Sequence, residues 1–273
     1  MQKLICPNPK LLITAVSVAI LCVGCHSSED EIKTPSTKTT TPAQSQNISD
    51  LTSKTEQIIP QPNIQIPTGK LLAAHGNPAI TTHLVALPSK LTIKKELVHT
   101  DVRQPLLAMI NAAAQDGIDL TIVSAYRSYT HQKQIWEKKW GNAPQDSVEK
   151  ALEILQWSSF PGTSRHHWGT DVDFNNVNTA YWQAGEGAAT YQWLQANAAK
   201  FGFCQTYGPN RNKGYNEEPW HWSHMPTAKQ YFAQVSHPNS LATIVNQGVK
   251  GSAAVQQLPL IDYITDITPC SVE

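Results

Sequence analysis

This sequence of 273 residues has few charged residues, few long apolar runs and few cysteines. Charged residues make up only 15% of it, and 21 basic residues balance 21 acidic ones, so no charge of one sign dominates. There is no basic stretch of the kind that follows a phosphate backbone, which argues against a nucleic-acid partner. Long apolar runs are scarce too, since the run at residues 11–21 is too short for a comfortable membrane span. No internal repeat is evident.

The N-terminus has the pattern of an export signal. Lys3 and Lys10 provide a positive start, residues 11–21 are almost wholly apolar, and a Gly-Cys pair ends at Cys25. This arrangement resembles a bacterial lipoprotein signal, in which Cys25 carries the lipid and becomes the new N-terminus; an ordinary secretory signal cleaved nearby is the alternative. We therefore expect an exported protein anchored to a bacterial membrane. His26, rather than an aspartate, follows Cys25, so the periplasmic face of the outer membrane is expected where two membranes are present.

Cysteine is sparse, with five residues in the chain. Cys6 and Cys22 fall within the expected signal, and Cys25 is the expected lipid site. Cys204 and Cys270 remain, and we expect them to form a disulfide that ties the C-terminal tail to the folded part, because free thiols are a liability in an exported protein. Two unpaired thiols are the alternative.

Composition divides the chain into four parts. The stretch that follows the signal is rich in Ser, Thr, Gln and Pro and cannot bury enough apolar surface to fold. All eight tryptophans, by contrast, lie between Trp136 and Trp222, so the folded domain must be built around them. The expected parts are a lipoprotein-type signal at 1–24, a disordered tether at 25–68, a folded domain at 69–237 and a C-terminal extension of no assigned function at 238–273.

Apolar spacing predicts short helices and short strands in irregular order. Helices are expected at residues 102–115, 128–140, 147–157, 191–201 and 227–235. Strands are expected at residues 119–124, 170–174, 203–207 and 220–224. Because the two types do not simply alternate, we predict an α+β fold: a single compact domain in which helices pack around a small antiparallel sheet.

Three segments far apart in the chain hold the residues with evident chemistry. They read Ser-Ala-Tyr-Arg-Ser at 124–128, Ser-Arg-His-His-Trp-Gly-Thr-Asp-Val-Asp at 164–173, and Glu-Pro-Trp-His at 218–221. Together they offer two histidines and a carboxylate for a metal, a spare glutamate and an arginine. A zinc hydrolase needs this set, because three protein ligands leave a fourth position for water, a carboxylate moves the proton and a cation receives developing negative charge.

The middle segment leaves two choices of ligand open. Asp171 and Asp173 lie two apart, so on a strand both point to the same face, and either can bind a metal. His166 and His167 are likewise alternatives. Gly169 allows the chain to turn between histidine and aspartate. The simpler alternative is that these polar residues only cap a turn.

The last segment supplies a histidine and a glutamate three apart. Pro219 favours a corner that lets both side chains reach one metal. We expect His221 to be the ligand and Glu218 the proton carrier, since a fourth protein ligand would close the site. Glu217 and His224 are the alternatives for these two roles.

The segments resemble the VanY-type zinc D-alanyl-D-alanine carboxypeptidases, a family that also includes dipeptidases and endopeptidases of cell-wall peptides. The family pattern is Ser-x-His-x-x-Gly-x-Ala-x-Asp followed later by Glu-x-x-His, and its upstream Ser-Gly-Tyr-Arg-Ser-x-x-x-Gln is mirrored at 124–132. The matching residues are Ser124, Tyr126, Arg127, Ser128, Gln132, Ser164, His166, Gly169, Asp173, Glu218 and His221. Two positions depart from the pattern, with Asp171 in place of alanine and Ala125 in place of glycine. The resemblance covers residues 102–224.

The resemblance implies a role for most of the matching residues. One Zn²⁺ per domain would be held by His166, Asp173 and His221, with Glu218 as general base and Arg127 at the oxyanion. The implied substrate contacts are Gln132, Ser164 and Ser128. The partners implied are peptidoglycan stem peptides, cleaved by a monomer. Carboxypeptidase, dipeptidase and endopeptidase action stay open, as does a binding module with altered catalysis; a structural zinc domain fits poorly, because such sites use cysteines and histidines.

Overall fold

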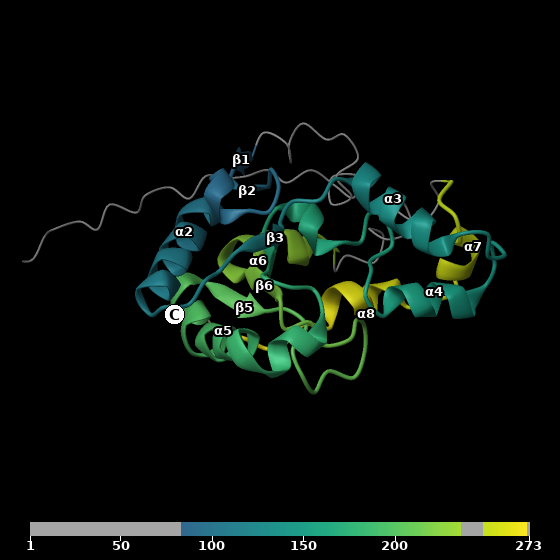
Figure 1. Cartoon of the computed structure of the whole chain (residues 1–273). Coiled ribbons are helices and arrows are strands. Elements are labelled where there is room, and N and C mark those ends of the chain that lie inside the picture. The colour runs from purple at the N-terminus through teal and green to yellow at the C-terminus, as the bar shows by residue number, and fades with distance from the viewer. Residues whose placement is uncertain (1–82, 236–247, 272–273) are drawn as a thin grey trace, which may run out of the picture. The chain divides into compact units, whose positions relative to one another are not determined.

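The computed structural model describes residues 83–235 and 248–271 (Figure 1). These residues belong to one compact unit that spans Pro60–Glu273. The expected signal at 1–24, the tether at 25–68 and the lipid site at Cys25 lie outside the described residues. None of the helices in the described ranges has both the length and the apolar character needed to cross a bilayer.

A small antiparallel sheet lies at the centre of the described residues and confirms the predicted fold class. Its strand order is β3-β4-β6-β5, and every neighbouring pair is antiparallel. The bounds are β3 Ile122–Ser124, β4 Asp171–Phe174, β5 Phe203–Gln205 and β6 His221–His224. All eight residues of the two central strands, β4 and β6, are buried. Sequence analysis did not predict a second, two-stranded sheet formed by β1 (Leu84–Ala86) and β2 (Leu97–His99).

Helices lie at both ends of the sheet (Figure 1). In this view α2 and α5 lie on the left, α3, α4 and α7 gather on the right, and α6 lies by β6, which it contacts. The α-helices are α2 Thr100–Gln115, α3 Tyr129–Trp140, α4 Val148–Leu155, α5 Gly185–Asn197, α6 Met225–Val235, α7 Ser252–Val255 and α8 Leu260–Thr265. The 3-10 turns are η1 Ser89–Leu91, η2 Arg165–Trp168, η3 Thr179–Gln183 and η4 Ala198–Phe201.

The main core joins α2 to the sheet. Val102, Leu106 and Met109 recur at helical spacing along α2 and are fully buried. They belong to the same apolar cluster as Val172 and Phe174 of β4. One face of β4 therefore packs against α2, and its polar side chains Asp171 and Asp173 lie on the other face.

A second core anchors the C-terminal extension. Trp136 and Trp140 of α3 share an apolar cluster with Val255 of α7, and the indole of Trp136 donates a 2.8 Å hydrogen bond to the carbonyl of Lys250. The predicted disulfide between Cys204 and Cys270 is confirmed, with the two Cα atoms 6.1 Å apart. The described part of the extension therefore packs on the domain and is covalently tied to β5.

One helix differs clearly from its predicted range. A helix was expected at residues 191–201, but α5 begins at Gly185, and residues 198–201 form the 3-10 turn η4. The first turn of α5 contains Gly185 and Gly187. Because glycine is a poor helix former, the sequence did not indicate that the helix begins there. Tertiary packing selects glycine here, because a Cβ on Gly187 would lie 2.0 Å from the carbonyl oxygen of Tyr181.

Candidate metal centre

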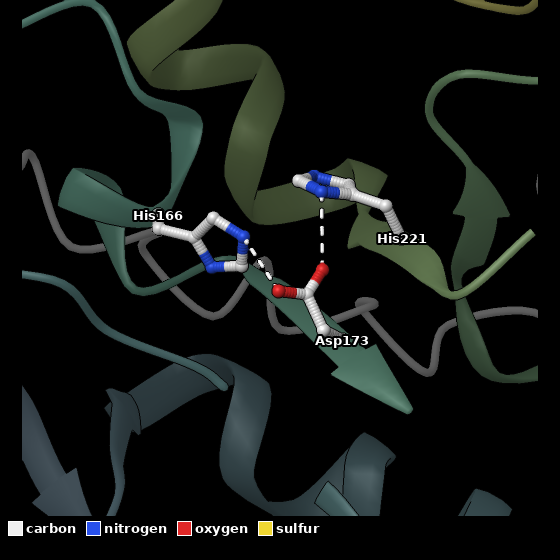
Figure 2. Close-up of side chains that lie close together, drawn as sticks. All are labelled: His166, Asp173 and His221. Atoms are coloured by element: carbon white, nitrogen blue, oxygen red, sulfur yellow. Dashed lines mark ion pairs between the residues drawn. The ribbon is translucent and has the colours of Figure 1, made fainter. Parts of the chain in front are cut away.

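Three side chains from three different elements meet on the open face of the sheet. His166 lies on η2, Asp173 on β4 and His221 on β6, and one possible ligand atom from each lies within 4.8 Å of the others (Figure 2). His166 Nε2 is 3.3 Å from Asp173 Oδ2, and His221 Nδ1 is 3.2 Å from Asp173 Oδ1. All three residues are buried. They are the set expected from the sequence.

The turn that carries His166 depends on a glycine. Gly169 ends η2 with φ 70°, a left-handed conformation that favours glycine. A Cβ at this position would lie 2.8 Å from Cδ2 of Leu84 and 2.9 Å from the backbone nitrogen of His99. Its carbonyl also accepts a 2.8 Å hydrogen bond from His99 N–H. The β1–β2 hairpin therefore packs directly on the backbone that positions His166.

Hydrogen bonds on the outer side of each imidazole aim the inner nitrogen at Asp173. Nδ1 of His166 lies 2.7 Å from the carbonyl oxygen of Ala125, which can only accept, so Nδ1 carries the proton and Nε2 faces the centre. His221 is turned the other way: its Nε2 lies 2.9 Å from Asp171 Oδ2, and its Nδ1 faces Asp173. Two nitrogen lone pairs and one carboxylate thus converge.

The donor set and the charges fit a divalent cation. Asp173 Oδ1 is buried and has no hydrogen-bond partner in the described structure, and it faces Nδ1 of His221, whereas Oδ2 faces His166. Burial by itself raises the pKa of Asp173, but the neighbouring His166 and His221 outweigh burial and hold that pKa well below its usual value. Burial lowers the pKa of His221, whereas the adjacent carboxylates of Asp171, Asp173 and Glu218 raise it well above the usual value. The potential in this corner is therefore negative and favours a bound cation.

A glutamate and an arginine flank the three candidate ligands. Glu218 is buried, and its Oε2 lies 3.3 Å from Nδ1 of His221. Nη2 of Arg127 lies 3.7 Å from Asp173 Oδ2. Both side chains line the same cleft as the three candidate ligands. The cleft therefore combines a possible metal site, a carboxylate beside it and a fixed cation.

Comparison with known proteins connects this arrangement to a family. The family model VanY, described as D-alanyl-D-alanine carboxypeptidase, matches residues 95–227. The chain carries a VanY-family domain. All the cleft residues discussed above lie inside the matched range, so the site belongs to the VanY-type domain itself.

Two curated relatives and one solved structure illustrate the similarity of the VanY-type domain. YodJ of Bacillus subtilis (strain 168), which bears a carboxypeptidase name, is 30% identical over 137 residues, 47% of this chain and 46% of the relative. A D-alanyl-D-alanine carboxypeptidase of Enterococcus faecalis (strain ATCC 700802 / V583) is 31% identical over 122 residues, 43% of this chain and 44% of the relative. A vancomycin-resistance D,D-pentapeptidase VanY from a VanB-type cassette, crystallised with Zn(II), is 27% identical with a TM-score of 0.43, covering 54% of this chain and 83% of that one. The matches span less than half the length of the two curated relatives.

Of the three residues expected to contact substrate, one lines the cleft and two do not. Ser164 lines the cleft, and its hydroxyl is buried without a hydrogen-bond partner in the described structure. Gln132 is fully buried instead, where its Oε1 accepts a 2.9 Å hydrogen bond from Nη1 of Arg127. Ser128 caps α3 by accepting from the backbone N–H of His131. Neither Gln132 nor Ser128 is among the residues that line the described cleft, which differs from the expectation that they contact substrate.

The alternative ligands all have other partners. Nε2 of His167 accepts a 3.1 Å hydrogen bond from Gly162 N–H, and its Nδ1 lies 2.6 Å from the carbonyl oxygen of Arg127. Glu217 lies 3.4 Å from the Tyr191 hydroxyl, and His224 lies 2.8 Å from the Thr227 hydroxyl. Asp171 binds the outer side of His221.

Sequence analysis missed three residues of this region. It assigned no role to Arg165, which is buried and forms a 2.8 Å ion pair with Asp171. It also missed Trp157 and Val177, two exposed apolar side chains that line the cleft. The acidic Asp171 six residues after Arg165 was a usable signal for the ion pair, whereas nothing local marks the other two. Trp168, which follows His167 in the motif, does not line the cleft and is buried against Tyr231 and Arg165.

Proposed function

We propose that this chain is a zinc-dependent peptidase that removes the C-terminal D-alanine from peptidoglycan stem peptides. The observation that carries the proposal is the arrangement of His166, Asp173 and His221, which offer three ligand atoms, with Glu218 close enough to share their cleft. Catalytic zinc sites use three protein ligands and leave a position for water or substrate. The membership of the VanY family supports the same reaction class.

Glu218 and Arg127 have different roles in the proposed reaction. When bound, Zn²⁺ supplies Lewis-acid chemistry, lowering the pKa of water and polarising the scissile carbonyl. Glu218 accepts the proton of the attacking water and returns it to the nitrogen of the leaving D-alanine as the C–N bond breaks. Arg127 faces the carboxylate of Asp173 and is held by Gln132 and Ser124, so its charge is fixed before negative charge develops on the carbonyl oxygen.

The location of the activity belongs to the same proposal. We infer that the protein is exported and anchored through lipid on Cys25, which would place the VanY-type domain at the membrane surface that faces the cell wall. Stem peptides are reached there without transport. In a bacterium with two membranes, the expected surface is the periplasmic face of the outer one.

The deciding experiment uses the full chain and muropeptides that end in D-Ala-D-Ala. We expect release of free D-alanine that stops when a chelator removes the metal and returns when Zn²⁺ is added. Hydrolysis of free D-Ala-D-Ala without cleavage of the muropeptide would reassign the chain as a dipeptidase, and cleavage of cross-links would reassign it as an endopeptidase. Tight retention of the muropeptide without any cleavage would overturn the proposal in favour of a binding module.

A further inference from the structure

The carboxylate of Asp171 is completely enclosed behind His221. Oδ2 accepts hydrogen bonds from Arg165 Nε at 2.8 Å and from His221 Nε2 at 2.9 Å. Oδ1 accepts from the hydroxyls of Thr170 at 2.6 Å and Ser223 at 2.7 Å. The residue has no exposed surface. The hydroxyl of Thr206 also lies 3.5 Å from Oδ2. Because each oxygen accepts from at least two donors, the carboxylate is held in one orientation.

Arg165 holds Asp171 in place and balances its charge. The guanidinium is buried, donates from Nη2 to the hydroxyl of Ser223 at 2.8 Å, and lies 4.6 Å from the ring centroid of Trp168. An unpaired carboxylate at this depth would be strongly disfavoured. The ion pair with Arg165 therefore allows the Asp171 carboxylate to stay charged while it accepts a hydrogen bond from Nε2 of His221.

The register of the sheet places two aspartates on opposite sides of one ring. Asp173 is the cross-strand partner of His221, and Asp171 is the partner of Ser223, two residues along on the same face. Asp173 faces Nδ1 of His221, and Asp171 faces Nε2. A neutral imidazole carries one proton, and an acceptor at Nε2 keeps the proton there, leaving the Nδ1 lone pair directed at the centre.

We propose that Asp171 is a positioning residue for the metal site: it holds His221 in the Nε2–H tautomer and in the orientation that presents Nδ1 as a ligand. This inference rests on the proposed metal site, and it assigns a task to a carboxylate that is not itself a ligand. Such an outer partner raises the basicity of the ligand nitrogen and removes the cost of ordering the ring on binding.

The test compares the affinity of purified full-length variants for Zn²⁺, measured by competition with a zinc-binding dye. Asp171→Ala removes the acceptor and is expected to raise the Kd of Zn²⁺ about 10- to 100-fold. Asp171→Asn keeps an oxygen that accepts from Nε2–H, while the hydroxyls of Thr170 and Ser223 can turn to accept from the new amide. We expect it to recover most of the affinity. If the carboxylate served only to pair the charge of Arg165, Asp171→Asn would be as weak as Asp171→Ala.

A second variant guards against loss of folding. Asp171→Ala leaves the buried guanidinium of Arg165 unpaired, so the double variant Arg165→Met/Asp171→Ala removes both charges together. It is expected to fold, as judged by circular dichroism, and still to bind Zn²⁺ about 10- to 100-fold more weakly. A folded double variant with the Kd of the unaltered protein would overturn the inference.

The unaltered protein provides a test that needs no substitution. In the ¹⁵N-labelled, Zn²⁺-loaded chain, we expect a slowly exchanging ring proton on Nε2 of His221 and none on Nδ1. A ring proton on Nδ1 would overturn the assignment. The two proposals fail in distinguishable ways: an unaltered chain that binds no Zn²⁺ overturns the metal site as well, whereas Zn²⁺ binding that is indifferent to residue 171 overturns only the role of Asp171.

Discussion

Asp173 and His221 face each other across the β4–β6 ladder, and the same pair brings a carboxylate oxygen and an imidazole nitrogen to 3.2 Å. Two of the three candidate ligands are therefore positioned by sheet register rather than by a loop. A shift of one residue in this register would turn one of the two side chains to the opposite face. The geometry of the candidate metal centre therefore depends on the central strand pairing of the fold.

Removal of the proposed base should separate catalysis from metal binding. We expect Glu218→Gln to lower kcat by about 10²- to 10⁴-fold, because general-base catalysis contributes on that order. The Kd of Zn²⁺ should change little, since His166, Asp173 and His221 remain. The matched control is Glu217→Gln, one position earlier, whose carboxylate lies by the Tyr191 hydroxyl. Turnover by Glu218→Gln at the unaltered rate would rule out its role as base.

Substitution of the arginine should affect the chemical step. Arg127→Lys keeps a positive charge but loses the two side-chain hydrogen bonds to Gln132 and Ser124, so we expect kcat to fall about 10²-fold. Gln132→Leu should cause a smaller fall, because it frees the arginine without removing it. Steady-state kinetics on one stem peptide measures both changes. A larger loss in Gln132→Leu than in Arg127→Lys would instead indicate that Gln132 acts directly.

The exposed tryptophan at the cleft should contribute to substrate affinity. Trp157 is 43% exposed, lines the cleft and stacks on Trp220 with ring centroids 6.1 Å apart. We expect Trp157→Ala to raise KM about tenfold, equivalent to roughly 1.4 kcal/mol, with little change in kcat. Leu152→Ala is the control, since Leu152 is 42% exposed and does not line the cleft. Equal effects of the two substitutions would argue against substrate contact at Trp157.

Acid should destabilise the fold through a histidine away from the metal centre. Burial lowers the pKa of His224 to about 4, with a small opposing effect of Asp101 and a reinforcing one of His99. The unfolded chain, with a histidine pKa near 6.5, therefore binds the proton first as pH falls. Stability is full above pH 6.5 and declines towards pH 4, and from pH 7 to pH 5 this residue should cost about 2 kcal/mol of unfolding free energy.

Urea unfolding at pH 7 and pH 5 measures this contribution. His224→Asn should be less stable overall but show a smaller difference between the two pH values. The pKa of His131 on α3 is also lowered, by burial first and then by Arg127 and Lys94, so His131→Asn measures a separate part of the same pH difference. An unchanged pH difference in His224→Asn would mean that other groups cause the acid sensitivity.

The disulfide should stabilise the domain more than it shapes the cleft. It joins residues 66 apart in sequence, and closing a loop of that length restricts the unfolded chain by about 4 kcal/mol. We expect the double variant Cys204→Ser/Cys270→Ser to lose free energy of unfolding on this order while retaining Zn²⁺ binding. Urea unfolding with and without reductant provides the comparison, because reductant should destabilise only the unaltered protein. No difference between the two proteins would contradict the prediction.

The candidate ligands were predictable from sequence because the resemblance to the VanY pattern selects His166, Asp173 and His221, where spacing alone left His167 and Asp171 as alternatives. The roles of their neighbours were not. Gln132 lies in the same motif as Arg127, yet spacing cannot distinguish a side chain that contacts substrate from one that orients the arginine. The structure has Gln132 fully buried against Arg127.

Long-range pairing explains the remaining gaps. Asp171 was recognised only as an alternative ligand, because its position behind His221 depends on the register between β4 and β6. The β1–β2 pair was missed because both strands precede residue 102, where no element was assigned from the apolar spacing. In contrast, the apolar spacing along α2 predicted that helix to within two residues at its start.

The wide separation of the ligands along the chain has a consequence for biosynthesis. A growing polypeptide that has not yet reached residue 218 offers an ion only the imidazole of His166 and the carboxylate of Asp173. The third donor lies on β6, the last strand of the sheet in chain order, opposite Asp173. Capture of an ion by all three donors would therefore require β6 to be paired with β4, and a product truncated before His221 would lack the third donor.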